Sequence, residues 1–171
     1  MDILRLIFLG AFFIFSINHS ILANNLSEKV SNRYEFELYD SDNEDFKLIL
    51  ELLENGKTAE ALENLYLLIE EAKRLNDTKL VIEGQLLLAD VYRENGDYQK
   101  SNEIFYELIP SIPTDFEKLQ YVFFKKGGNF QLENQIDSAK ANYEKAISYN
   151  HNVEKNEDLK AKMYANLSGI Y

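Results

Sequence analysis

The sequence predicts an all-α protein built from antiparallel helix pairs, and the stretch 86–113 shows this most clearly. Leu88, Ala89 and Tyr92 set large, small and aromatic side chains at helical spacing, so all three share one face. Gly96-Asp97 then supplies a left-handed C-terminal position and an N-cap for the next helix. The same spacing recurs before and after this stretch, which indicates a repeat.

A second helix follows the Gly-Asp turn and packs back on the first. Ser101, Phe105 and Leu108 restart the apolar pattern at i, i+4 and i+7, and Pro113 is expected to end it. Small side chains at Ala89 and Ser101 would let the two backbones approach closely. We therefore expect one tightly packed helix pair.

Copies of this pattern occur on both sides at a period near 40 residues. The upstream copy lies 40 positions earlier, counted from Gly56 to Gly96, and the downstream copy 38 positions later, counted from Ser101 to Ala139. The matching residues are Leu48, Ile49, Leu52, Gly56, Ala61, Leu65 and Leu68 upstream, Gly127, Phe130, Ala139, Tyr143 and Ala146 downstream, and Leu167, Ser168 and Tyr171 at the opening of a fourth copy.

These residues resemble the tetratricopeptide repeat (TPR) pattern of a large residue, Leu-Gly, Tyr, Ala, Phe and Pro at fixed spacing. The sequence departs from it at Gln85, where Trp is usual, at Ser101, where Ala is usual, and in its longer period. The resemblance spans residues 43–171 and implies a right-handed α-solenoid of about three full repeats plus the first helix of a fourth. A solenoid normally ends in a capped repeat, so we expect the chain to be a fragment of a longer protein.

The first 42 residues are predicted to lie outside the repeat array. Residues 1–23 read as a signal peptide, because Arg5 precedes the apolar run 6–15 and Ala23 offers a cleavage site. An uncleaved membrane anchor is the alternative. Residues 24–42 form an acidic linker that leads into the first helix, which Ser41 and Glu44 would start as a capping box. We therefore expect an exported, periplasmic or extracytoplasmic protein.

Turn and breaker residues delimit the predicted helices. Asp77 or Thr78 would start the third helix, Pro110 and Pro113 would break the chain after the fourth, and Thr114 with Glu117 would form a capping box for the fifth. The expected helices are Phe46–Asn55, Ala59–Leu75, Lys79–Asn95, Tyr98–Ile109, Asp115–Leu132, Asp137–Asn150 and Glu157–Tyr171, with a loop at Asn152–Asn156.

Composition argues against catalysis, a cofactor, a metal site or nucleic-acid binding. The chain has no cysteine, and His151 in a predicted loop is the only histidine after the signal peptide, so neither a zinc site nor a Ser-His-Asp triad can be assembled. The net charge of −11 disfavours binding to phosphate backbones. We expect no enzyme activity, and membrane contact only through an uncleaved anchor or a missing C-terminal region.

The TPR resemblance implies a concave groove lined by the first helix of each pair. Carried over position by position, the groove residues are Phe46, Lys47, Glu83, Leu86, Asp90, Arg93, Tyr121, Phe124, Lys125, Gln131, Lys162 and Asn166. Leu50, Asp90 and Gly128 stand where a carboxylate-gripping groove has Asn, so a mixed apolar and charged groove for a peptide or helix is the better fit. We expect Arg93, Tyr121 and Phe124 to be the anchors.

Two functions agree with these features. The first is an exported adaptor that binds a protein or peptide partner in the groove. The alternative is the N-terminal sensory part of a larger signalling protein, a TPR-containing histidine kinase or DNA-binding regulator, whose extracytoplasmic repeats also run near 40 residues.

Overall fold

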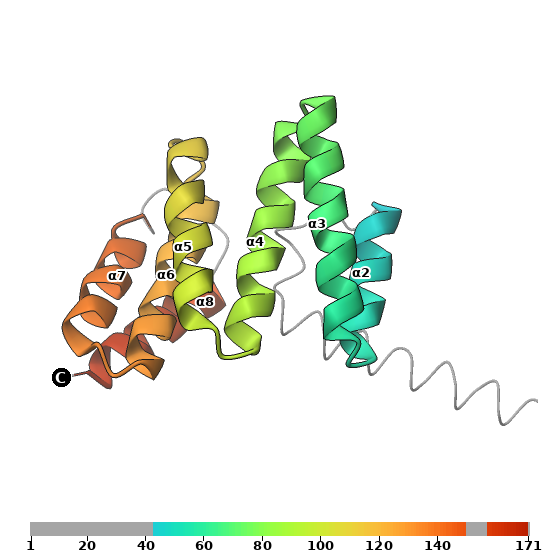
Figure 1. The fold of residues 1–171 in the computed structure, drawn as a ribbon. Helices are drawn as coiled ribbons and strands as arrows, with labels where there is room; N and C mark the ends of the chain where they lie inside the picture. Colours follow the sequence, from blue (N-terminus) through green and yellow to red (C-terminus); the bar gives the residue numbers. More distant parts are fainter. Residues whose placement is uncertain (1–42, 150–156, 171) are drawn as a thin grey trace, which may run out of the picture.

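The computed structural model describes residues 43–149 and 157–170, and within them the protein is all-α (Figure 1). The fold-class prediction is confirmed at that level, since the described residues contain helices and no strand. The elements are α2 (Glu44–Glu54), α3 (Thr58–Leu75), α4 (Thr78–Glu94), α5 (Tyr98–Leu108), the 3-10 turn η2 (Ile109–Ser111), α6 (Phe116–Leu132), α7 (Ile136–Tyr149) and α8 (Glu157–Ser168).

Side-chain caps fix the starts of the helices, in two cases one or two residues from the predicted cap. The side chain of Asn43 accepts hydrogen bonds from the backbone of Asp45 and Phe46, so Asn43 rather than Ser41 caps α2. Asp115, and not Thr114, caps α6 by accepting from Lys118 N. The N-cap of α4 is Asp77, which settles the choice between Asp77 and Thr78.

Residues in the left-handed conformation form the turns between consecutive helices. Gly56 and Gly96 have φ values of 72° and 81°, which confirms both glycine turns, since a side chain is strained there. Asn76 and Asn134 take the same conformation, with φ values of 56° and 59°. Helix α5 ends at Leu108, one residue before the predicted end at Ile109, and the chain continues as the 3-10 turn that contains Pro110.

Each described helix makes its most extensive contacts with its neighbours in the chain, from α2 against α3 through to α7 against α8. Figure 1 shows α3, α5 and α7 towards the viewer, with α4 and α6 set behind them. A continuous apolar core runs from Phe46 in α2 to Val122 in α6. A smaller cluster of Ala146, Leu159 and Met163 joins α7 to α8, with Phe124 packed on it.

Small residues stand where helices touch. Ala61, Ala89, Ser101 and Ala139 are fully buried, as predicted. A Cβ atom built on Gly127 would lie 2.6 Å from Cδ1 of Tyr143, so α6 and α7 approach closely at that glycine. The sequence pattern did not identify Gly84, whose Cβ would lie 2.7 Å from Cγ1 of Ile69 in α3.

The predicted signal peptide, residues 1–23, the acidic linker, residues 24–42, and the loop that carries His151 lie outside the described residues. Within residues 43–149 and 157–170, no helix combines the length and apolar character needed to cross a membrane.

Candidate functional site

The twelve predicted groove residues differ widely in exposure. Six are buried, four are partly exposed and two are exposed. The buried ones are Phe46, Glu83, Leu86, Asp90, Tyr121 and Lys125, the partly exposed ones Arg93, Phe124, Gln131 and Asn166, and the exposed ones Lys47 and Lys162.

The buried residues hold the helices together. Phe46, Leu86 and Tyr121 belong to the main apolar core, where 1% or less of each residue is exposed. The Tyr121 hydroxyl donates a hydrogen bond to Oδ2 of Asp90, which links α6 to α4 inside the molecule. The ammonium of Lys125 lies over the Tyr121 ring, 4.8 Å from its centre. Tyr121 therefore has a packing role and offers no exposed ring to a ligand.

A polar cluster centred on Tyr143 brings three of the partly exposed groove residues together. The Tyr143 hydroxyl donates to Oε1 of Gln131 at 2.7 Å and accepts from Nδ2 of Asn166 at 3.3 Å. Arg93 from α4 approaches the same hydroxyl across Gly128, because a Cβ on Gly128 would lie 3.6 Å from Nη2 of Arg93 and 3.7 Å from the hydroxyl. We call these five residues the Tyr143 cluster. Four helices contribute to it: α4, α6, α7 and α8.

Arg93 is the cation of the Tyr143 cluster. Its Nη1 atom lies 2.9 Å from Oε1 of Glu94, and its buried Nε has no hydrogen-bond partner among the described residues. Burial raises the pKa of Tyr143, while the Asn166 hydrogen bond and the charge of Arg93 act in the opposite direction. The phenol is therefore neutral at physiological pH. The cluster offers a guanidinium and two amides, which are groups that pair with peptide amides and carboxylates.

Phe124 gives the Tyr143 cluster an apolar border. Its ring centre lies 5.9 Å from that of Tyr143, and it packs on the Ala146, Leu159 and Met163 cluster. The structure therefore gathers Arg93, Phe124, Gln131 and Asn166 around one buried tyrosine. Lys47 lies in α2, which contributes no residue to the Tyr143 cluster, and Lys162 is an exposed residue of α8.

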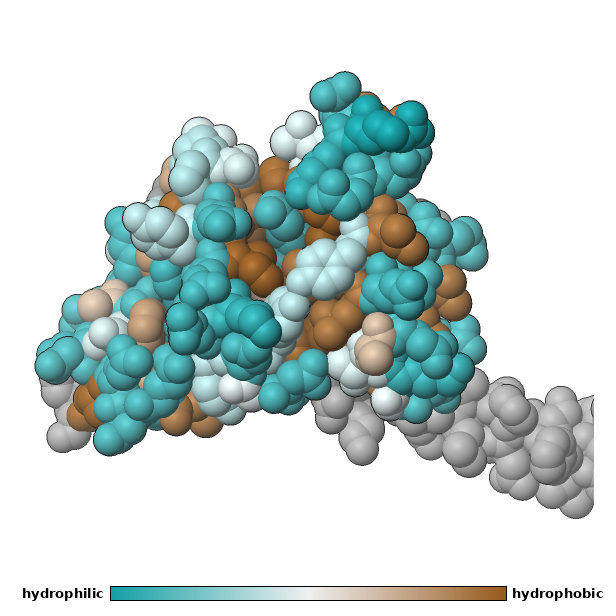
Figure 2. All heavy atoms as spheres, viewed as in Figure 1, coloured by the Kyte–Doolittle hydropathy of each residue, from teal (hydrophilic) through white to brown (hydrophobic). Residues whose placement is uncertain are grey.

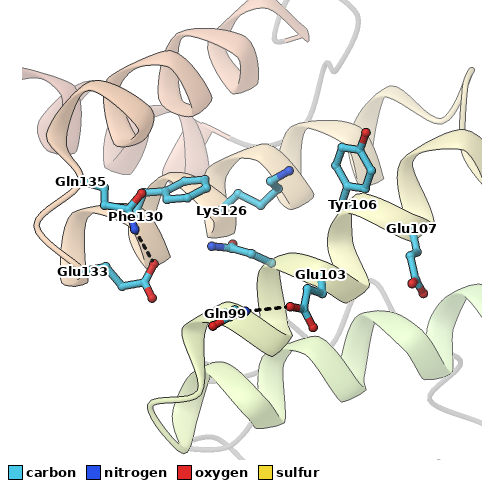
Figure 3. Close-up of a pocket in the computed structure, with 9 residues that line it drawn as sticks. Gln99, Glu103, Tyr106, Glu107, Lys126, Phe130, Glu133 and Gln135 are labelled. Carbon is cyan, nitrogen blue, oxygen red and sulfur yellow. Dashed lines mark hydrogen bonds between the residues drawn. The ribbon is translucent and has the colours of Figure 1, made fainter.

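Two clefts that the sequence analysis missed flank helix α5. The first has a volume of about 360 Å³ and lies between α3, α4 and α5. Figure 2 shows apolar surface inside the gap between α3, α4 and α5. The second, about 420 Å³, lies between α5, α6 and the turn that joins α6 to α7 (Figure 3). The sequence signal that could have pointed to them is Tyr106, an exposed aromatic residue between two glutamates of an amphipathic helix.

The described ranges contain no group of three or more His, Cys, Asp and Glu side chains that could hold a metal ion. Comparison of the chain with known protein families, with curated proteins and with solved structures finds no match.

Proposed function

We propose that this protein is an exported TPR-like scaffold that binds a peptide or protein partner on the face formed by α4, α6 and α8. Three features support a right-handed solenoid of repeated helix pairs. The small residues at equivalent positions of successive pairs are buried. Glycines with positive φ form the turn between the two helices of each of the first two pairs. The extensive contacts are those between consecutive helices. The apolar run 6–15 supports export.

The observation that carries the binding proposal is the partly exposed Tyr143 cluster beside Phe124. The amides of Gln131 and Asn166 can donate and accept, and Arg93 can donate from its guanidinium, so the cluster can satisfy the polar groups of an extended peptide. Phe124 and the apolar cluster behind it would receive an apolar side chain next to these polar groups.

Capture of partner from a cell-envelope extract tests the proposed face. A triple variant, Arg93→Ala, Phe124→Ala and Asn166→Ala, should recover much less of the same partner band than wild type. The control, Glu63→Ala, alters an exposed residue of α3 that lines neither cleft and should recover as much as wild type. Tyr121→Ala is unsuitable because it would empty a core position. Equal recovery by all variants would contradict the proposed face.

Export is tested separately by N-terminal sequencing of protein taken from the cell envelope. Cleavage after Ala23 predicts a sequence that begins at Asn24. Intact protein that begins at Met1 in a soluble cytoplasmic fraction would contradict export without touching the binding proposal.

A further inference from the structure

Helix α5 separates the two clefts and presents acidic side chains to both. Glu103 and Glu107 line the cleft towards α3 and also the cleft towards α6. They are four positions apart on one helix, so they lie one turn from each other on the same face. Figure 3 shows Glu103, Tyr106 and Glu107 along α5, with Lys126 and Phe130 across the second cleft. We call the surface formed by α5 and its two clefts the α5 ridge.

Both clefts have apolar walls close to the ridge. Leu88, Tyr92 and Ile104 contribute to the first cleft, together with Tyr66 and Ile69 of α3. Tyr106 and Phe130 contribute to the second. Tyr106 is 72% exposed, which is unusual for a large aromatic residue and typical of an anchor in a protein-binding surface.

The charges on the α5 ridge favour a cation. The two lysines of the first cleft already form ion pairs. Nζ of Lys73 lies 2.7 Å from Oε1 of Glu70, and Nζ of Lys100 lies 2.8 Å from Oδ2 of Asp97. Neither Glu103 nor Glu107 forms an ion pair with any side chain in residues 43–149 or 159–170, and Oε1 of Glu103 accepts a hydrogen bond from Nε2 of neutral Gln99 at 3.0 Å. Glu133 adds a third carboxylate to the second cleft.

In the second cleft, the positive charge of Lys126 opposes these carboxylates, but its ammonium lies against aromatic rings. The ammonium of Lys126 lies 5.4 Å from the ring centre of Tyr106 and 5.8 Å from that of Phe123, and the residue is 8% exposed. Three carboxylates line the second cleft against this one ammonium. The excess of negative charge therefore remains, and the overall charge of −11 would attract a basic partner from a distance.

We propose that the α5 ridge is a second docking surface, whose occupant is an extended basic segment of a partner protein. A lysine or arginine of that segment lies against Glu103 and Glu107, and apolar side chains on either side of it enter the two clefts. A helix is about 10 Å wide, and an extended chain advances about 3.3 Å per residue. The two apolar side chains are therefore about three to four positions apart, with the basic residue between them.

This surface is separate from the Tyr143 cluster. The α4 residues in the first cleft are Gln85, Leu88 and Tyr92, which share one face of the helix. Arg93 follows Tyr92 directly, and adjacent residues point in different directions on a helix. Helix α5 itself contributes nothing to the Tyr143 cluster. Binding at the α5 ridge can therefore be tested independently of binding at the Tyr143 cluster.

A phage-displayed library of random nonapeptides, selected on the full chain, tests the proposal without knowledge of the natural partner. The enriched peptides should share a lysine or arginine with apolar residues on both sides. A fluorescein-labelled peptide of the consensus sequence is then titrated by fluorescence anisotropy. Glu103→Gln with Glu107→Gln should weaken its binding by about tenfold or more, and Tyr106→Ala should also weaken it.

A matched variant separates the local effect from the loss of overall charge. Glu63→Gln with Glu117→Gln removes two exposed carboxylates on α3 and α6 that line neither cleft, and should change the affinity by less than about twofold. Thermal melting by circular dichroism confirms that each variant is folded. Enrichment of peptides without basic residues, the absence of any enrichment, or equal affinity for the ridge and control variants would overturn the proposal. A peptide weakened instead by Arg93→Ala and Phe124→Ala would overturn it too, while supporting the Tyr143 face.

Discussion

Helices α4 and α6, which the proposed repeat alignment makes equivalent, have the same length, 17 residues, yet they use their buried positions differently. Helix α4 buries a run from Leu86 to Val91 in which Asp90 is the one polar residue. Helix α6 buries four polar residues, Gln120, Lys125, Lys126 and Asn129. Two helices of equal length therefore differ in what they bury: α4 is mainly an apolar core helix, and α6 carries polar side chains that border both candidate surfaces.

Single positions show the difference directly. The 38-residue offset places Lys126 where α4 has Leu88, and Gly127 where α4 has Ala89. Fully buried Asn129 joins α6 to α5, because its Nδ2 donates to Oγ of Ser101 at 3.0 Å and to Oδ1 of Asn102 at 2.9 Å. We therefore expect substitutions in α4 to act mainly on stability, whereas those in α6 act on stability and on the surfaces around it.

The largest expected effect is that of Ala89→Leu in α4. Ala89 is fully buried in the main core, so three additional carbon atoms have no space and must displace neighbours. We expect a loss of about 3 kcal/mol in the free energy of unfolding, measured by urea titration. Ala59→Leu, on the exposed start of α3, is the control and should be nearly neutral. An unchanged midpoint for Ala89→Leu would contradict the proposed repeat alignment.

The adjacent glycines of α6 should respond to alanine with opposite signs. Gly127→Ala places a Cβ within 2.7 Å of two Tyr143 ring atoms, so α7 must shift, and we expect a loss of about 1–2 kcal/mol. Gly128→Ala meets nothing closer than 3.6 Å, so helix propensity should increase stability by up to about 1 kcal/mol. The melting temperatures of both variants, compared with that of the wild type, measure these two changes in stability. Equal shifts in the same direction would show that the α6–α7 approach is looser than the structure has it.

A hydrogen bond between α4 and α6 is tested by Tyr121→Phe. The substitution keeps the buried ring and removes the hydroxyl that donates to Asp90. We expect a loss of about 1–2 kcal/mol, because the carboxylate loses a buried donor. Tyr106→Phe, at an exposed hydroxyl of α5, serves as the control and should be neutral in the same urea titration. A neutral Tyr121→Phe would mean that the bond makes no net contribution to stability.

The smallest expected effect is that of Lys126→Leu, which gives α6 the residue that α4 has at Leu88. Burial lowers the pKa of Lys126 below the ordinary lysine value of 10.5. Between the lowered pKa and 10.5 the unfolded chain binds more protons than the folded chain, so the free energy of unfolding of the wild type rises with pH in that window. At pH 7 the variant should be more stable by roughly 0.5 kcal/mol.

This advantage of Lys126→Leu should shrink as the pH approaches 10.5, since a leucine does not titrate. Urea titrations of wild type and variant at neutral pH and in this alkaline window measure the difference. An advantage that stays constant or grows with pH would contradict the burial cost assigned to Lys126.

Because apolar spacing and glycine turns act locally, sequence periodicity predicted the helix bounds to within two residues, except that α8 ends at Ser168 and not at the predicted Tyr171. It misplaced the caps at Asn43 and Asp115, since several residues able to cap stand side by side and the side-chain geometry decides between them. Tyr121 was predicted as an exposed anchor, and its burial depends on how α4 and α6 meet, which no local pattern encodes. The Tyr143 cluster and the α5 ridge combine side chains from three or more helices, so only the packed structure reveals them.

Each helix packs mainly on its neighbours in the chain, and this has a consequence for local opening. Because extensive contacts join consecutive elements, we expect opening at one end to leave the other end intact, as in the proposed solenoid. Amide hydrogens of α8 should therefore exchange with solvent through sub-global opening, well before those of α4. A partner that pairs with Asn166 would hold α8 against α7 and slow that exchange, so occupancy of the Tyr143 cluster could be measured as a change in local kinetics.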